Sequence, residues 1–273
     1  MNGEKGFQGG APRGGAGSCG QLPFTVYRSL FTLFTVGCGI SPLRGHAVVG
    51  RDAYLIFVGD GVGNRPDLFA VRAEGGPVFQ ITFTSLAELS PALAPDGGSV
   101  AFLRGRTIGD SLPATVWLLN LVNGAERELA LPRGSPAPDG VGWSADGRSL
   151  YVRAGALIYR LDAPPAPAGP RSVTGIERPA AESSLAVLVG EPPFGRVVPC
   201  HEGLCAQTDG WAPAPFASRA RDAVRWGDDS VGFLVGSEVV VRPVGPGRSR
   251  RLEWSGAPAN PRQLTYFPGK GPP

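Results

Sequence analysis

Short apolar runs, each preceded by a turn signal, recur along most of this chain. The clearest run is Val100–Leu103, which follows an Asp-Gly step at Asp96. The same order returns fifty residues later, where Leu150–Val152 follows Asp146, and again in a less regular form after Asp228. An Asp-Gly step favours a tight hairpin, because glycine accepts positive φ and the aspartate side chain can bond nearby backbone. The pattern therefore predicts a repeating series of β-hairpins.

Each repeat continues into a second apolar strand and a short closing strand. The predicted second strands are 67–71, 115–121, 157–161 and 238–242, and the predicted closing strands are 79–83, 126–129, 171–174 and 250–254. Four short strands per unit and spacings of about 40–50 residues are typical of propeller blades. Degenerate copies at 51–58 and 182–189 bring the count to five. The predicted fold is all-β, a β-propeller of five four-stranded blades, or six if residues 261–267 are a further closing strand.

Several segments carry a resemblance to a known repeat. Residues 94–97 and 144–147 match its turn, and residues 80–83 and 262–265 match its Arg-Gln-Leu-Thr ending. They resemble the TolB-like β-propeller repeat, a WD-like repeat, over roughly residues 50–267. The resemblance implies a non-catalytic protein that presents its loops to a protein or peptide partner. Peptidases of the prolyl-oligopeptidase type share the repeat, but residues 142–146 lack the second glycine of a G-x-S-x-G elbow, so we expect no hydrolase domain here.

The first 45 residues do not follow this pattern. Residues 1–20 are rich in glycine without periodicity, which is typical of a disordered leader. Arg28 then precedes a short apolar stretch that ends in a small residue and Cys38, which resembles a bacterial lipoprotein signal. In this interpretation Cys38 is lipidated, residues 46–268 form the propeller and 269–273 are a tail. The alternative is a buried strand or disordered tail with an ordinary cysteine.

Two more cysteines bear on the compartment. Residues 200–205 are expected to form a hairpin with Glu202 and Gly203 at its tip. Cys200 would then face Cys205 at a non-hydrogen-bonded position, with Cα atoms about 4.5 Å apart, and His201 would pair with Leu204. Such a disulfide persists in oxidising compartments. It predicts a periplasmic or membrane-anchored protein of the bacterial envelope, and two free thiols in a cytoplasmic chain are the alternative.

Composition and charge limit the classes of partner that we expect. The net charge is +3 over 273 residues, with scattered arginines, so we expect no nucleic-acid partner. There is no apolar run of 18 residues, and a lipid anchor is therefore the only membrane contact expected. We expect the protein to be monomeric.

Candidate chemistry is sparse, and we predict no catalytic, cofactor-binding or metal-binding residues. The two histidines, His46 and His201, have no nucleophile in a recognisable motif. The glycine-rich residues 59–64 precede a strand rather than a helix, which argues against a phosphate loop. Asp60, Asn64 and Asp67 miss the spacing of a calcium-binding EF-hand loop.

The recurring aspartates and tryptophans are predicted to be structural. Asp96, Asp146 and Asp228 hold equivalent places and would form turns rather than a ring of carboxylates. Trp143 and Trp226 hold equivalent places before the turn, where packing between blades is expected. Trp211 lies in a loop instead, and it is therefore the candidate for contact with a partner. The function predicted is a non-catalytic cell-envelope binding or scaffold protein. The alternatives are a propeller hydrolase or lyase with a channel-mouth site and a fragment of a larger propeller protein.

Overall fold

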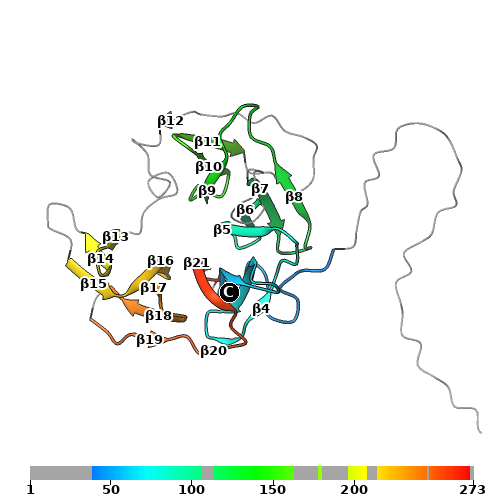
Figure 1. Cartoon of the computed structure of the whole chain (residues 1–273). Coiled ribbons are helices and arrows are strands. Elements are labelled where there is room, and N and C mark those ends of the chain that lie inside the picture. The colour runs from blue at the N-terminus through cyan, green and yellow to red at the C-terminus, as the bar shows by residue number, and fades with distance from the viewer. Residues whose placement is uncertain are drawn as a thin grey trace, which may run out of the picture. The chain divides into compact units, whose positions relative to one another are not determined.

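The computed structural model describes residues 39–105, 114–162, 178–179, 196–207, 214–244 and 246–270. All the secondary-structure elements within these ranges are β-strands (Figure 1). The described residues contain no helix that is long and apolar enough to cross a membrane. The all-β prediction is confirmed.

The strands form six sheets, five of which are consistently antiparallel. Sheet A has the order β21 (Ala259–Phe267), β1 (Tyr54–Asp60), β2 (Pro66–Arg72) and β4 (Phe79–Gln80). Sheet C has β5 (Ala87–Leu93), β6 (Ser99–Gly105), β7 (Thr115–Asn120) and β8 (Glu126–Leu129). Sheet D has β9 (Pro138–Trp143), β10 (Ser149–Ala154), β11 (Leu157–Asp162) and β12 (Arg178–Pro179).

The C-terminal half supplies the remaining sheets. Sheet E has β13 (Arg196–Cys200), β14 (Gly203–Gln207) and β15 (Ala214–Ser218). Sheet F has β16 (Ala220–Trp226), β17 (Ser230–Val235), β18 (Glu238–Pro243) and β19 (Arg250–Arg251). Sheet B is a parallel pair of β20 (Trp254–Ser255) with β3 (Gly76–Pro77).

Strand β1 shows how neighbouring sheets pack. Its side chains alternate between the two faces of sheet A, as in any strand. Ile56 and its even-numbered neighbours join a core with Phe102 of sheet C. Phe57 and its odd-numbered neighbours join a second core with Leu234 of sheet F. Both faces are thus covered, which explains why β1 reads as a continuous apolar run rather than an alternating one.

The other cores extend this packing in both directions. One buried cluster joins sheets C and D, and another joins sheets E and F. The first strands β9, β5, β21 and β16 contact one another in that order. The sheets therefore follow the order D, C, A, F, E about their first strands, which is a β-propeller arrangement.

The number of blades differs from the prediction. Among the described residues, four sheets have four strands each, and sheet E has three. The predicted strands at 171–174 and 182–189 lie outside the described residues, so a fifth four-stranded blade stays a prediction.

The C-terminal fragment was assigned wrongly from the sequence. Residues 261–267 belong to β21, which pairs with β1 rather than closing a sixth blade. β21 holds the place in sheet A that β5, β9 and β16 hold in their sheets. The ring of Phe267 lies 5.4 Å from that of Tyr54, in the core shared with sheet C. The reason is burial: as a first strand, β21 covers apolar residues at the start of the chain's first sheet.

The segment before β1 also packs on the sheets. Leu43 is fully buried in the core of sheets A and C, although it falls within the leader expected to end at residue 45. The Ser41 hydroxyl donates to the Leu121 carbonyl at 2.6 Å. Ser41 and Leu43 therefore pack with the sheets, although they precede the predicted start of the propeller at residue 46.

Candidate binding face at the first strands

Three neighbouring first strands share an irregular start. β5, β21 and β16 each lose register with the second strand of their sheet within a few residues of their beginning. Residues at these breaks have positive φ: Ser90 at 53° in β5, Asp222 at 54° in β16, and both Asn260 at 48° and Gln263 at 54° in β21, which has two breaks. A positive φ is uncommon outside glycine, and β-bulges gather at rims and next to functional sites. We call this end of the three strands the bulged face.

Side chains join the three strands across the bulged face. The Ser90 backbone N–H donates to Gln263 Oε1 at 2.8 Å, and the Leu93 N–H donates to Thr265 Oγ1 at 3.0 Å. On the other side of β21, Arg221 Nη1 donates to the Pro261 carbonyl at 2.8 Å. These bonds satisfy backbone groups that the sheets leave unpaired. They also show that β5 and β21 start at the same end.

The bulged face carries charges of both signs. Asp60, at the end of β1, accepts from Arg262 Nη1 at 3.0 Å and from Asn260 Nδ2 at 2.6 Å. Burial acts to raise the Asp60 pKa, but the hydrogen bonds from Asn260 and Arg262 and the charge of Arg262 lower it below its usual range. Arg221 forms a second pair with Asp222 at 2.9 Å. The face therefore offers paired charges and hydrogen-bonding groups rather than a single strong charge.

Two exposed apolar side chains flank these polar groups. Val62, in the turn after β1, is 79% exposed, and Phe83, in the loop before β5, is 77% exposed. The turn that holds Val62 lies at the bulged face because β1 ends where β21 begins. The loop that holds Phe83 lies there too, because the preceding residue, Thr82, accepts a hydrogen bond at Oγ1 from the Leu68 N–H, near the start of β2. An exposed aromatic ring beside hydrogen-bonding groups is typical of protein-binding surfaces.

A buried ionic cluster lies at the same end of sheet C. Arg104 donates to Glu88 Oε1 from Nε at 2.9 Å and from Nη2 at 2.7 Å, and its Nη1 donates to Glu126 Oε2 at 2.7 Å. Its guanidinium also lies 4.4 Å from the centre of the Trp117 ring. Burial acts to lower the Arg104 pKa, but the two carboxylates outweigh it and raise the pKa. A buried ion pair of this kind adds little net stability, because the cost of desolvating the charges offsets their attraction, but loss of one partner would leave an uncompensated buried charge.

The predicted disulfide is present, but in another register. Cys200 and Cys205 are bonded, with Cα atoms 5.8 Å apart. Cys200 pairs with Gly203, and Cys205 pairs with Val198, so the bridge joins diagonal positions. His201 and Glu202 therefore form the tip of the hairpin. The predicted tip at Glu202 and Gly203, and the pairing of His201 with Leu204, are wrong.

Gly203 gives the physical reason for this register. It has a φ of 143°, and a Cβ placed on it would lie 2.3 Å from the Ala217 carbonyl oxygen. The Arg219 N–H donates to the Glu202 carbonyl at 2.6 Å. The close approach of the chain around Ala217 therefore places the glycine at the first position of β14 rather than in the turn.

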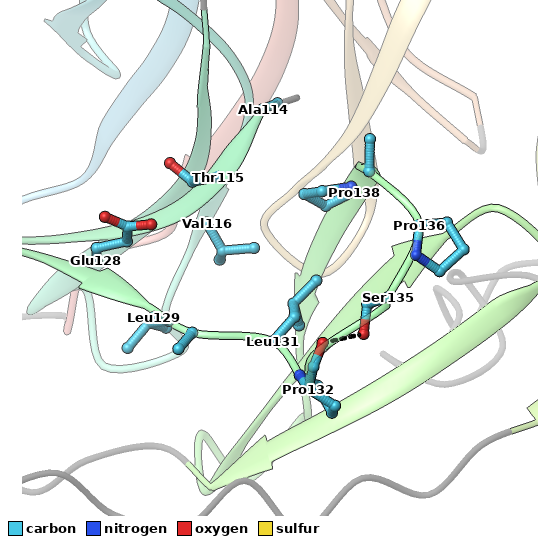
Figure 2. A pocket seen from close by; sticks show the side chains of 12 residues that line it. Ala114, Thr115, Val116, Glu128, Leu129, Leu131, Pro132, Ser135, Pro136 and Pro138 are labelled. Carbon is cyan, nitrogen blue, oxygen red and sulfur yellow. Dashed lines mark hydrogen bonds between the residues drawn. The ribbon is translucent and has the colours of Figure 1, made fainter. Parts of the chain in front are cut away.

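Two cavities open on other parts of the molecule. One, of about 190 Å³, is lined by the disulfide, His201, Glu202 and residues of β15. The other, of about 140 Å³, lies between β7, β8 and the proline-rich segment before β9, and Figure 2 shows its lining. There the Ser135 hydroxyl donates to the Pro132 carbonyl at 2.8 Å, and Glu128 is the charged residue of the lining. Among the described residues, no three His, Cys, Asp or Glu side chains gather as a metal site needs.

The recurring aspartates of the first two repeats form turns, as predicted. Asp96 Oδ1 accepts from the Gly98 N–H at 2.7 Å, and Asp146 Oδ1 accepts from the Arg148 N–H at 3.0 Å. The third copy differs, because Asp228 pairs with Arg225 at 3.0 Å.

Packing between sheets is confirmed for both predicted tryptophans. Trp143 Nε1 donates to the Ala92 carbonyl of the neighbouring sheet at 3.0 Å. Trp226 stacks on Tyr266 of the neighbouring sheet, with ring centres 4.1 Å apart.

The remaining candidates are placed as follows. Cys38 and Trp211 lie outside the described residues. His46 is exposed and stacks on Phe79, with ring centres 3.9 Å apart. The bulges were not foreseen, although the Ser-Pro step at Ser90 is an available signal, since proline is confined to irregular or edge positions of sheets.

Comparisons with known proteins give structural neighbours. No protein-family model and no curated protein sequence matches the chain. The chain is similar to TolB from Acinetobacter baumannii (12% identity, TM-score 0.41, 82% of this chain and 68% of that one). It is also similar to a protein assigned as TolB from Agrobacterium tumefaciens (15% identity, TM-score 0.35, 80% and 74%). An acylaminoacyl peptidase from Pyrococcus horikoshii is similar over 73% of this chain and 30% of its own (14% identity, TM-score 0.31). TM-scores below 0.5 say nothing about function.

Proposed function

We propose that this chain is a non-catalytic propeller of the bacterial cell envelope that binds a protein or peptide partner at its bulged face. The observation that carries the proposal is the combination at that face of bulged first strands, paired charges and two exposed apolar side chains. Val62 and Phe83 supply apolar area, and Asp60, Arg262 and Asn260 supply hydrogen bonds beside it. Such a mixture suits a polypeptide partner, which presents both apolar side chains and backbone polar groups.

The envelope location rests on the disulfide. A bond between Cys200 and Cys205 fits an oxidising compartment, because cytoplasmic thiols are kept reduced. Lipidation of Cys38, contact of Trp211 with the partner, a fifth four-stranded blade and a monomeric state belong to the same proposal. The scattered charges leave nucleic acid outside it.

The test is co-purification of the partner from envelope extract after crosslinking. Val62→Ser with Phe83→Ser removes the two apolar contacts without touching a core residue. Val122→Ser is the matched control, since Val122 is 61% exposed and lies in the turn after β7. We expect the wild type and the control to retain the same partner and the double variant to lose it. Retention of that partner by all three proteins would exclude the bulged face as the binding site.

A second measurement addresses the location. Mass spectrometry of the mature protein from its host should find a lipid-modified N-terminus at Cys38 and a bond between Cys200 and Cys205. An unprocessed Met1 with free thiols would contradict an envelope protein.

A further inference from the structure

Asp67, the second residue of β2, has one buried carboxyl oxygen without a partner. The residue is 3% exposed. Its Oδ2 accepts from Gln80 Nε2 at 2.9 Å, and a Cβ placed on Gly61 would lie 2.1 Å from that oxygen. The turn after β1 therefore lies directly against the carboxyl group. The other oxygen, Oδ1, is buried and accepts no hydrogen bond.

Glu88, the second residue of β5, is in the same situation. Its side chain is fully buried. Its Oε1 accepts both bonds from Arg104 and a third, at 3.1 Å, from the Thr84 hydroxyl. The remaining Arg104 bond goes to Glu126, so the guanidinium does not serve the second oxygen of Glu88. That oxygen, Oε2, is buried and accepts no hydrogen bond.

The two carboxyl groups belong to adjoining strands of different sheets. β2 of sheet A contacts β5 of sheet C. Burial, and after it the negative charge of Glu88, raise the Asp67 pKa to about 6, while the charge of Arg65 and the Gln80 hydrogen bond oppose the rise. Two ionised carboxylates that interact in a buried site repel each other, and a proton held by one of them removes the repulsion. It also supplies a donor to the two unpartnered oxygens, which no side chain serves although the Arg65 Nε nearby is itself buried without an acceptor.

We propose that Asp67 and Glu88 share one proton across the interface of sheets A and C, with Asp67 Oδ1 as the donor and Glu88 Oε2 as the acceptor. The proton comes from solvent and leaves to solvent as the pH rises. The groups that face this pair are Arg65 from the turn before β2, Gln80 from β4, Thr82 and Thr84 from the loop before β5, Arg104 from β6 and Glu126 from β8. Arg104 stays charged throughout, so the shared proton is the part of this cluster that changes in mildly acidic conditions.

The test is a carboxyl-carbon NMR titration of the full chain between about pH 2.5 and 8. In the wild type we expect one aspartate signal with a midpoint near pH 6, absent from Asp67→Asn. In Glu88→Gln, the Asp67 midpoint should fall by about one unit or more, because the negative neighbour is lost and the amide can donate to Oδ1. Asp139→Asn, at an exposed ion pair with Arg153, should leave the midpoint unchanged.

Three outcomes would overturn the proposal. The first is an Asp67 midpoint near the ordinary 3.8. The second is a midpoint that stays near pH 6 in Glu88→Gln, since burial alone would then account for it. The third is a midpoint that moves when calcium or magnesium replaces EDTA, because a cation would then occupy the two oxygens. If Asp67→Asn fails to fold, as judged by circular dichroism, the wild-type and Glu88→Gln titrations still decide between these outcomes.

Discussion

Ser90 and Gln263 lie 173 positions apart in the chain and are joined by a hydrogen bond of 2.8 Å from the Ser90 N–H to Gln263 Oε1. Both residues have positive φ and both lie in β-bulges of first strands. The bond links the strand supplied by the C-terminus to the sheet that follows the first one. The Gln263 side chain thus supplies a hydrogen bond between two sheets whose backbones do not pair with each other. This bond fixes the position of β21 relative to β5 at the bulged face.

Replacing Gln263 with leucine should destabilise the protein by about 1–2 kcal/mol, because the Ser90 N–H loses its acceptor while it stays partly buried. The free energy of unfolding from urea denaturation measures the change. Glu238→Gln, at an exposed ion pair with Arg251, serves as the control and should change stability by less than about 0.5 kcal/mol. Equal effects of the two substitutions would show that the bond does not join the sheets in solution.

The two tryptophans before the turns offer a matched comparison. Trp143 packs between sheets and donates a hydrogen bond, whereas Trp226 packs on Tyr266 through its ring face. Both Trp143→Phe and Trp226→Phe remove side-chain volume. Trp143→Phe also leaves the Ala92 carbonyl without its hydrogen-bond donor. We expect Trp143→Phe to cost about 1 kcal/mol more than Trp226→Phe in urea denaturation. A larger loss at Trp226 would mean that stacking outweighs the hydrogen bond.

Local turn chemistry explains why the sequence predicts the strands well. The Asp-Gly steps at Asp96 and Asp146 act through bonds within two residues, so they are visible in a short window of sequence. The pairing of β21 with β1 is invisible in such a window, because it depends on which strand covers an apolar core at the other end of the chain. The C-terminal fragment was therefore recognised as a strand but placed in the wrong blade.

The same distinction applies to the disulfide and to the buried pair of carboxyl groups. The disulfide follows from the spacing of two cysteines, but its register depends on the approach of Ala217 to Gly203, which sequence spacing does not contain. The pair of Asp67 and Glu88 was missed for a similar reason. Each residue is an ordinary polar position beside a strand, and only the packing of β2 against β5 buries both carboxyl groups.

The buried pair should make stability depend on pH in a defined direction. The Asp67 pKa is raised to about 6 in the folded state, so the folded chain binds this proton more tightly than the unfolded chain. Its contribution is fully present below the ordinary value of 3.8 and is lost as the pH rises through about 6, by up to about 3 kcal/mol. Lowered carboxyl pKa values, such as that of Asp60, act in the opposite direction and only at lower pH.

Asp67→Asn isolates this dependence. The amide can donate to Glu88 Oε2 at every pH and so imitates the protonated carboxyl group. The variant should be more stable than the wild type in urea denaturation at both pH 5 and pH 7.5, and its advantage should grow by about 1.4 kcal/mol between them, because the wild-type contribution is already partly lost at pH 5. A constant difference between variant and wild type across this range would show that Asp67 does not titrate there.

Loss of the disulfide should weaken sheet E more than the rest of the protein. The bond closes a loop with a sequence separation of 5 and joins β13 to β14 around an exposed tip, so its removal should cost about 2 kcal/mol through chain entropy. In Cys200→Ser with Cys205→Ser, amide hydrogen exchange should accelerate in β14 and remain unchanged in β1. Cys205→Ser alone removes both the bond and the buried Cys205 side chain, whereas reduction of the wild type breaks the bond alone, so the difference between the two isolates the side chain. If reduction leaves exchange in β14 unchanged, strand pairing rather than the disulfide holds this hairpin together.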